Sequence, residues 1–177
     1  MRRNVSLILS ILLAAGALSA GCGGGAKKAL AGKAGELMSA QAAEKLDPAA
    51  KIGGKVAVVE SHFNRPASLE GFHADGSIDQ LSAFFFSPRR KAQSVEEIET
   101  LVKIDCQKGD AILGSSPTMY ASLCDVSLID FKTKTLFAKK RFENKTTFNG
   151  VSVIDESVAR PPSEEIKAYL REFSTYE

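Results

Sequence analysis

The two histidines of this chain are the first residues to consider for metal or acid–base chemistry. Glu60 lies two residues before His62, a spacing that places both side chains on one face of a β-strand. His73 and Asp75 form a second close pair. An imidazole and a carboxylate together offer nitrogen and oxygen ligands, but this spacing matches no established zinc motif. Two loop histidines in solvent are the simpler interpretation of His62 and His73.

Motifs for nucleophilic or phosphate chemistry are absent from the sequence. There is no Gly-x-Ser-x-Gly elbow, no His-Glu-x-x-His motif and no phosphate-binding glycine loop. Asp105, Asp125 and Asp130 lie in or beside predicted strands, and two converging carboxylates could perform acid–base catalysis. Exposed strand and turn carboxylates explain them better. The sequence therefore predicts no catalytic residue and no cofactor.

Two short basic clusters, at residues 89–91 and 139–141, offer a different kind of chemistry. Each could contact anionic lipid headgroups or a polyanionic envelope glycan. The alternative is that they are solvated: a loop after Pro88 and strand residues facing water. Lysines along a strand also discourage edge-to-edge aggregation.

The N-terminal segment has the pattern of an export signal. Arg2 and Arg3 precede an apolar run over residues 5–18, about 14 residues where a membrane span needs roughly 20. A basic start, a short apolar run and small residues at the end predict a signal peptide over residues 1–21.

The sequence "SAGC" at residues 19–22 resembles the lipobox of bacterial lipoproteins, with Ser19 in the place of the usual aliphatic residue. The resemblance implies that Cys22 is acylated and becomes the mature N-terminus, so that several acyl chains hold the protein on a bilayer. Gly23 after the cysteine implies sorting to the outer membrane, facing the periplasm. The alternatives are an ordinary secretory peptide cleaved near residues 20–21, which leaves Cys22 a free thiol, or an uncleaved anchor.

Export also changes the interpretation of the other two cysteines. With Cys22 lipidated, Cys106 and Cys124 remain as an even pair in an oxidising compartment. A disulfide between them would contribute on the order of 3 kcal/mol in the chain-entropy model. Two buried free thiols or a redox pair are the alternatives, although redox pairs usually have Cys-x-x-Cys spacing.

The net charge of +2 includes Arg2 and Arg3, so removal of the signal leaves +2 − 2 = 0. A neutral mature chain argues against a nucleic-acid partner, since phosphate binding needs clustered cations. About 155 residues remain, which is enough for one domain.

The hydrophobic pattern predicts one α+β domain over residues 52–177, tethered by a lipidated N-terminus and flexible linker over residues 22–51. Residues 34–46 form at most a marginal helix. Strands are expected at 55–60, 99–107, 118–131 and 135–143, with a turn at Gly109–Asp110 and a short return strand after it. From Ser163, an apolar stripe predicts a helix. The expected fold is an antiparallel β-meander sheet of four to six strands covered by a C-terminal amphipathic helix.

These observations favour a non-enzymatic, membrane-anchored cell-envelope lipoprotein that acts as a binding or assembly module. Its partners would be the lipid bilayer, through Cys22, and an envelope protein or glycan. The alternative is a periplasmic enzyme or metal-binding protein whose site lies in the poorly patterned region 61–93, around His62 and His73. A ligand pocket beneath Phe84–Phe86 is a third hypothesis.

Overall fold

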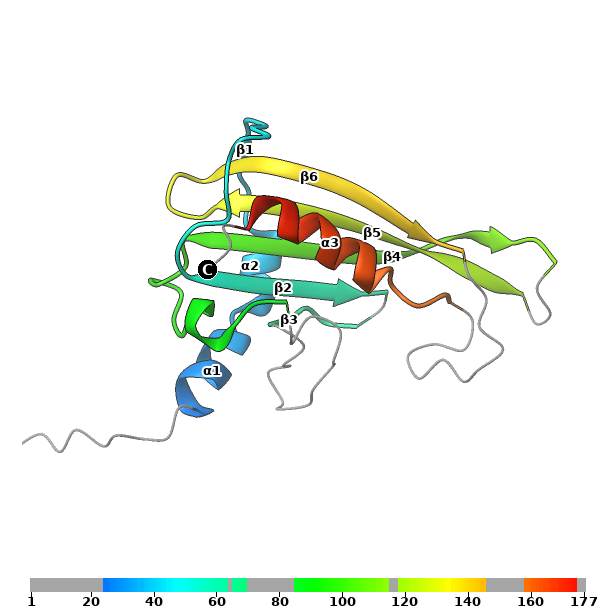
Figure 1. The fold of residues 1–177 in the computed structure, drawn as a ribbon. Helices are drawn as coiled ribbons and strands as arrows, with labels where there is room; N and C mark the ends of the chain where they lie inside the picture. Colours follow the sequence, from blue (N-terminus) through cyan, green and yellow to red (C-terminus); the bar gives the residue numbers. More distant parts are fainter. Residues whose placement is uncertain (1–23, 64, 70–84, 115–117, 146–157, 175–177) are drawn as a thin grey trace, which may run out of the picture.

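A computed structural model describes residues 24–63, 65–69, 85–114, 118–145 and 158–174 of the chain. In these ranges six strands form one sheet in the order β1–β6–β5–β4–β2–β3 (Figure 1). The strands are β1 (Ala43–Glu44), β2 (Val56–His62), β3 (Ser68–Leu69), β4 (Thr100–Ile112), β5 (Met119–Asp130) and β6 (Thr135–Asn144). The helices are α1 (Gly24–Ala31), α2 (Ala34–Ser39), the 3₁₀ turn η1 (Pro88–Arg90) and α3 (Ser163–Phe173). No helix in the described ranges has the length and apolarity needed to span a bilayer.

The meander β4–β5–β6 is antiparallel, as the alternating pattern predicts, but the sheet as a whole is mixed. Strand β2 pairs in parallel with β4, and β1 pairs in parallel with β6. The expectation of a purely antiparallel sheet is therefore wrong for the two strands that flank the meander, β2 and β1. The reason is that β4 begins at the end of the sheet where β2 also begins: Val56 forms a bridge with Lys91 and pairs with Thr100, so the two strands run in the same direction.

The turn expected at Gly109–Asp110 is also wrong, because β4 continues through this point to Ile112. The register between β4 and β5 shifts between Lys108 and Ala111, which marks a bulge. A Cβ atom at Gly109 would lie 2.9 Å from Leu123 Cγ, so glycine permits the close approach of the two strands. Beyond the bulge, the β4–β5 hairpin extends past the other strands of the sheet (Figure 1).

Helix α3 covers one face of the sheet and carries the stripe that the sequence predicts. Its apolar side chains pack onto β4, β5 and β6, and Tyr169 and Phe173 meet edge to face with ring centroids 5.1 Å apart. The buried residues of the stripe are Ile166, Tyr169, Leu170 and Phe173. This apolar contact explains why an 11-residue helix is stable here.

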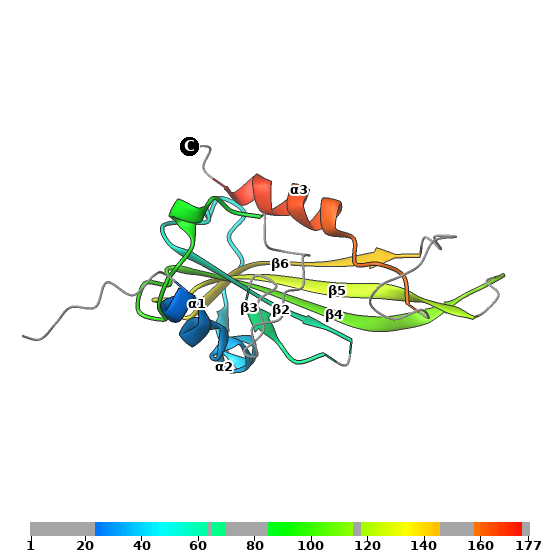
Figure 2. The same ribbon diagram turned by 90° about the horizontal axis from the view of Figure 1, so that it is seen from below.

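Helices α1 and α2 cover the opposite face of the sheet, so the fold has three layers (Figure 2). Leu30 and Leu37 are 3% and 4% exposed and share a cluster with Val59 and Leu101 of the sheet. The expectation of a flexible linker over residues 22–51 is therefore wrong for α1 and α2. Two leucines and several small alanines are enough to dock these helices, although the segment has few large apolar residues.

Candidate functional site

Three polar side chains are buried together at one end of β2. Glu60 and His62 follow Val56 and Val58 along the face of β2 that α3 covers. Ser68 of β3 lies directly opposite Glu60 in the antiparallel register. Their side chains are almost fully inaccessible, with exposed fractions of 0% for Glu60, 2% for His62 and 1% for Ser68. We call Glu60, His62 and Ser68 the buried polar cluster.

The polar atoms of this cluster have almost no partners. His62 Nε2 lies 3.2 Å from Glu60 Oε2, and this ion-pair contact does not have the geometry of a hydrogen bond. Five side-chain atoms are buried without a hydrogen-bond partner: Glu60 Oε1 and Oε2, His62 Nδ1 and Nε2, and Ser68 Oγ. Each unpaired buried polar group costs about 1–3 kcal/mol, and a charged group costs more. A cluster that destabilises the fold in this way is a candidate for function.

Apolar residues and a disulfide surround the cluster. His62 lies beside Cys106 in the parallel register of β2 and β4, and Cys106 pairs directly with Cys124 of β5. The structure joins these two cysteines in the disulfide that the sequence predicts. Val58 and Ile104 belong to the same core. Because this environment is apolar, a charge inside it interacts with its neighbours more strongly than it would in water.

The backbone is strained next to the cluster. Phe63, which follows His62, has a φ of 50°, in the left-handed region that bulky residues rarely adopt. Two hydrogen bonds hold this turn: Phe63 N–H donates to the Cys106 carbonyl, and Arg65 N–H donates to the His62 carbonyl, both at 2.8 Å. Strain of this kind costs on the order of 1–3 kcal/mol and is found often at functional sites.

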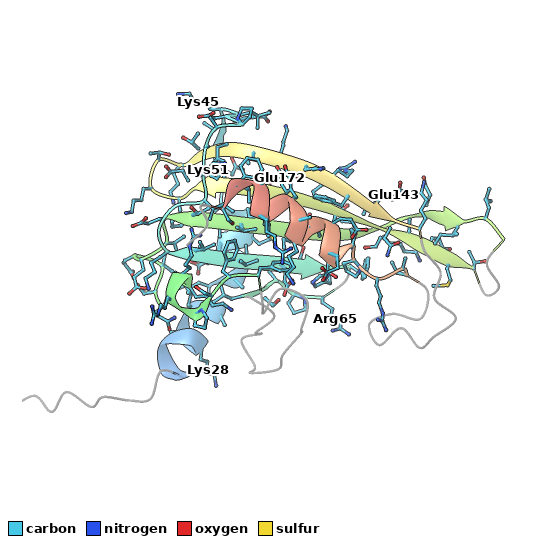
Figure 3. The ribbon with its side chains drawn as sticks, viewed as in Figure 1. Lys28, Lys45, Lys51, Arg65, Glu143 and Glu172 are labelled. Atoms are coloured by element: carbon cyan, nitrogen blue, oxygen red, sulfur yellow. A yellow bond between two sulfur atoms is a disulfide. The ribbon has the colours of Figure 1, made fainter. Side chains whose placement is uncertain are left out.

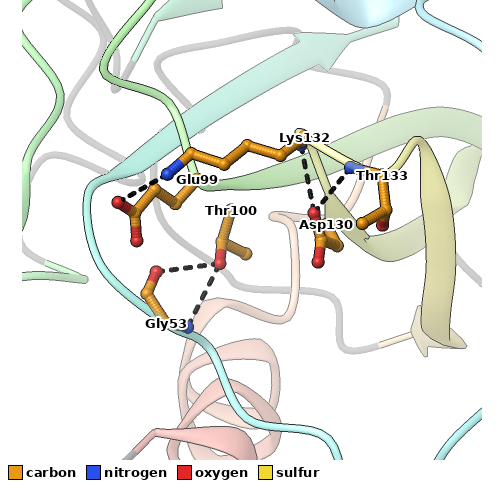
Figure 4. A network of polar contacts seen from close by, with 6 residues as sticks. All are labelled: Gly53, Glu99, Thr100, Asp130, Lys132 and Thr133. Atoms are coloured by element: carbon orange, nitrogen blue, oxygen red, sulfur yellow. Dashed lines mark hydrogen bonds and ion pairs between the residues drawn. The ribbon is translucent and has the colours of Figure 1, made fainter.

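A pocket of about 560 Å³ lies at the opposite end of β2, where the β5–β6 turn approaches the chain before β2. Its polar groups are engaged with one another (Figure 4). Thr100 Oγ1 donates to the Gly53 carbonyl at 3.0 Å, and Lys132 pairs with Glu99 at 2.9 Å. Asp130 accepts from the backbone N–H groups of residues 132 and 133, which fixes the turn. These contacts assign the predicted carboxylate Asp130 to turn formation.

Lys45 and Lys51 also line this pocket, and both are labelled in Figure 3. Lys51 Nζ donates to the carbonyl of Glu172 in α3 at 3.0 Å. This contact ties the segment before β2 to the C-terminal helix. The hydrogen bonds at this end of the sheet thus hold elements together, in contrast to the unpartnered atoms of the buried polar cluster.

The structure brings Asp105 and Asp125 together, on the sheet face opposite α3. They are directly opposite each other in the β4–β5 register. Arg141 donates two hydrogen bonds to Asp125, at 2.7 and 2.6 Å, and these bonds raise the pKa of the arginine. Ser61 and Gln107 donate to Asp105. Since both carboxylates already accept such bonds, they are poorly placed to act as an acid–base pair.

Both basic clusters are used in part for packing. Arg90 donates to the Ile52 carbonyl at 2.7 Å and lies over the Phe86 ring. In the other cluster, Lys139 pairs with Glu44, and Lys140 lies over the ring of Phe142 in β6 and that of Tyr169 in α3. These contacts favour a structural role for the two clusters over a binding surface.

Several predicted residues lie outside the described ranges: Cys22, His73 and Phe84. Of the two histidines, the structure therefore describes His62, which is buried rather than in a solvated loop. No sequence pattern indicates Ser68, because its position depends on the pairing of β2 with β3. Comparison with protein-family models, with curated proteins and with solved structures finds no match to this chain.

Proposed function

We propose that this protein is a lipid-anchored component of the bacterial cell envelope. In this proposal residues 1–21 are removed, Cys22 carries the lipid, and the domain faces the periplasm from the outer membrane. The domain acts as a non-enzymatic binding or assembly module that holds an envelope protein or glycan at the membrane surface.

The lipobox-like sequence at residues 19–22 supports the lipid anchor, and the place where the folded domain begins supports its position close to the membrane. Helix α1 starts at Gly24, two residues after Cys22. Since a residue spans at most about 3.6 Å, Gly24 would lie within about 7 Å of the acylated cysteine. The docking of α1 and α2 on the sheet would then hold the domain close to the bilayer rather than on a long tether. A partner would be bound directly at the membrane surface.

Membrane fractionation tests the anchor. We expect Cys22→Ser to move the protein from the membrane fraction to the soluble fraction, because the acyl chains supply the membrane affinity. The control is the double variant Cys106→Ala, Cys124→Ala, which lacks the disulfide but keeps the anchor and should stay in the membrane fraction. Retention of the Cys22→Ser protein in the membrane would contradict the proposal.

The second candidate function is a metal-binding protein or periplasmic enzyme that uses His62 and His73. The burial of Glu60 and His62 with unpartnered polar atoms favours it. The test is complementation of a gene deletion by the double variant His62→Ala, His73→Ala. Loss of complementation by a folded variant supports this function, and full complementation contradicts it.

A further inference from the structure

We propose that Glu60, His62 and Ser68 bind one divalent transition-metal ion of the zinc class. The proposal concerns the interior of the domain and does not depend on the lipid anchor. It begins from the positions of the three residues: two are alternate residues of β2 on one face, and the third is directly opposite on β3. The sheet thus brings three side chains that carry ligand atoms to one place.

The separation of the two strongest ligands fits a shared ion. Zinc binds imidazole nitrogen and carboxylate oxygen at about 2.0–2.2 Å, so two ligands at a tetrahedral angle lie about 3.3 Å apart. The observed distance from His62 Nε2 to Glu60 Oε2 is 3.2 Å. A direct salt bridge at this distance would normally include a hydrogen bond between the two groups. Glu60 Oε2 and His62 Nε2 form none.

The chemistry of the ligand set indicates the class of metal. An imidazole nitrogen beside a carboxylate oxygen suits zinc and its neighbours, whereas calcium and magnesium prefer oxygen ligands alone. Both cysteines near the site are joined in the disulfide, so no thiolate is available from Cys106 or Cys124. In the described ranges no three His, Cys, Asp or Glu side chains gather as a metal site. In the proposal the third ligand is the hydroxyl of Ser68, which lies directly opposite Glu60 and has no hydrogen-bond partner, and a water molecule takes the fourth position.

A metal also accounts for the energetics better than a shared proton. A proton between Glu60 and His62 satisfies one atom of each and leaves Glu60 Oε1, His62 Nδ1 and Ser68 Oγ without partners. A cation neutralises the buried carboxylate and binds the hydroxyl in addition.

Zinc titration by calorimetry tests the proposal. The protein is the full chain with Cys22→Ser, which removes both the lipid and the thiol of Cys22. It is purified without a histidine tag and treated with a chelator. We expect binding of about one zinc ion per chain. Glu60→Gln and His62→Gln should each weaken binding at least about tenfold, since even residues behind a metal ligand contribute that much. Asp125→Asn, a carboxylate on the opposite face, is the matched control and should bind zinc unchanged.

X-ray absorption of the zinc-loaded protein keeps the test decisive if a variant does not fold. We expect nitrogen and oxygen neighbours at about 2.0–2.2 Å, an imidazole signature and no sulfur at about 2.3 Å. The absence of zinc binding, unchanged affinity in folded Glu60→Gln or His62→Gln protein, or a sulfur neighbour would each overturn the proposal. These measurements do not depend on where Cys22→Ser protein is found in the cell. The metal site can therefore be refuted without refuting the lipid anchor, and the anchor without the metal site.

Discussion

The docking of α1 and α2 on the sheet predicts that Leu37→Ala strongly destabilises the protein. Leu37 is 4% exposed and packs in the cluster formed with the sheet. Removing a buried leucine side chain in this way costs about 2–5 kcal/mol, from lost burial and from the cavity left behind. For a domain of this size each kcal/mol corresponds to about 2–4 °C, so the melting temperature should fall by roughly 4–20 °C.

Leu46 provides the matched control, because the same substitution there removes an exposed side chain. It lies in the same N-terminal segment but is 51% exposed. Leu46→Ala should therefore change the free energy of unfolding by no more than about 0.5 kcal/mol.

The assay is urea unfolding followed by circular dichroism, with both variants made in the soluble Cys22→Ser background. If the segment were a flexible tether, Leu37→Ala and Leu46→Ala would change the free energy of unfolding by the same small amount. Equal stability of Leu37→Ala and Leu46→Ala would therefore refute the docking of α1 and α2.

Two further predictions concern the disulfide and a buried tyrosine. Replacing Cys106 and Cys124 together with alanine should lower the free energy of unfolding by about 3 kcal/mol, measured against wild type in urea; an unchanged midpoint would contradict a structural role. Burial raises the pKa of Tyr169 above its usual 10.0, and Glu172 adds to this effect. The unfolded tyrosine ionises first, so this contribution to stability is present below pH 10 and is lost as the pH rises through the raised pKa. Tyr169→Phe should reduce that alkaline loss of stability, and identical pH profiles of unfolding would contradict the prediction.

The central strands and the last helix could be predicted because their signals are local. Alternation in β4, for example, places Val102, Ile104 and Cys106 on one face, and that face meets the stripe of α3. The exception is Gly109, where the sequence predicts a turn because glycine is typical of turns. Here it serves the close approach of β4 to β5 instead.

The remaining elements depend on contacts between distant segments. The parallel pairing of β2 with β4 follows from the long connection between them, which has no clear pattern of its own. Alanine-rich α1 and α2 resemble a linker in composition, and only the apolar face of the sheet shows where Leu30 and Leu37 pack.

The candidate site was predictable in one respect. Alternation along a strand indicates that Glu60 and His62 share a face, which the structure confirms. Their burial was not predictable, because polar residues at the end of a strand usually mark its exit into solvent. Ser68 joins them through pairing with β2, eight residues from Glu60 in the sequence.

Mass spectrometry of the N-terminal peptide of membrane-extracted protein tests the proposed function most directly. We predict a peptide that begins at Cys22 and carries the mass of the acyl chains, with residues 1–21 absent. An unmodified Cys22, or a chain that begins at another residue, would contradict the lipid anchor and with it the place of this domain at the membrane surface.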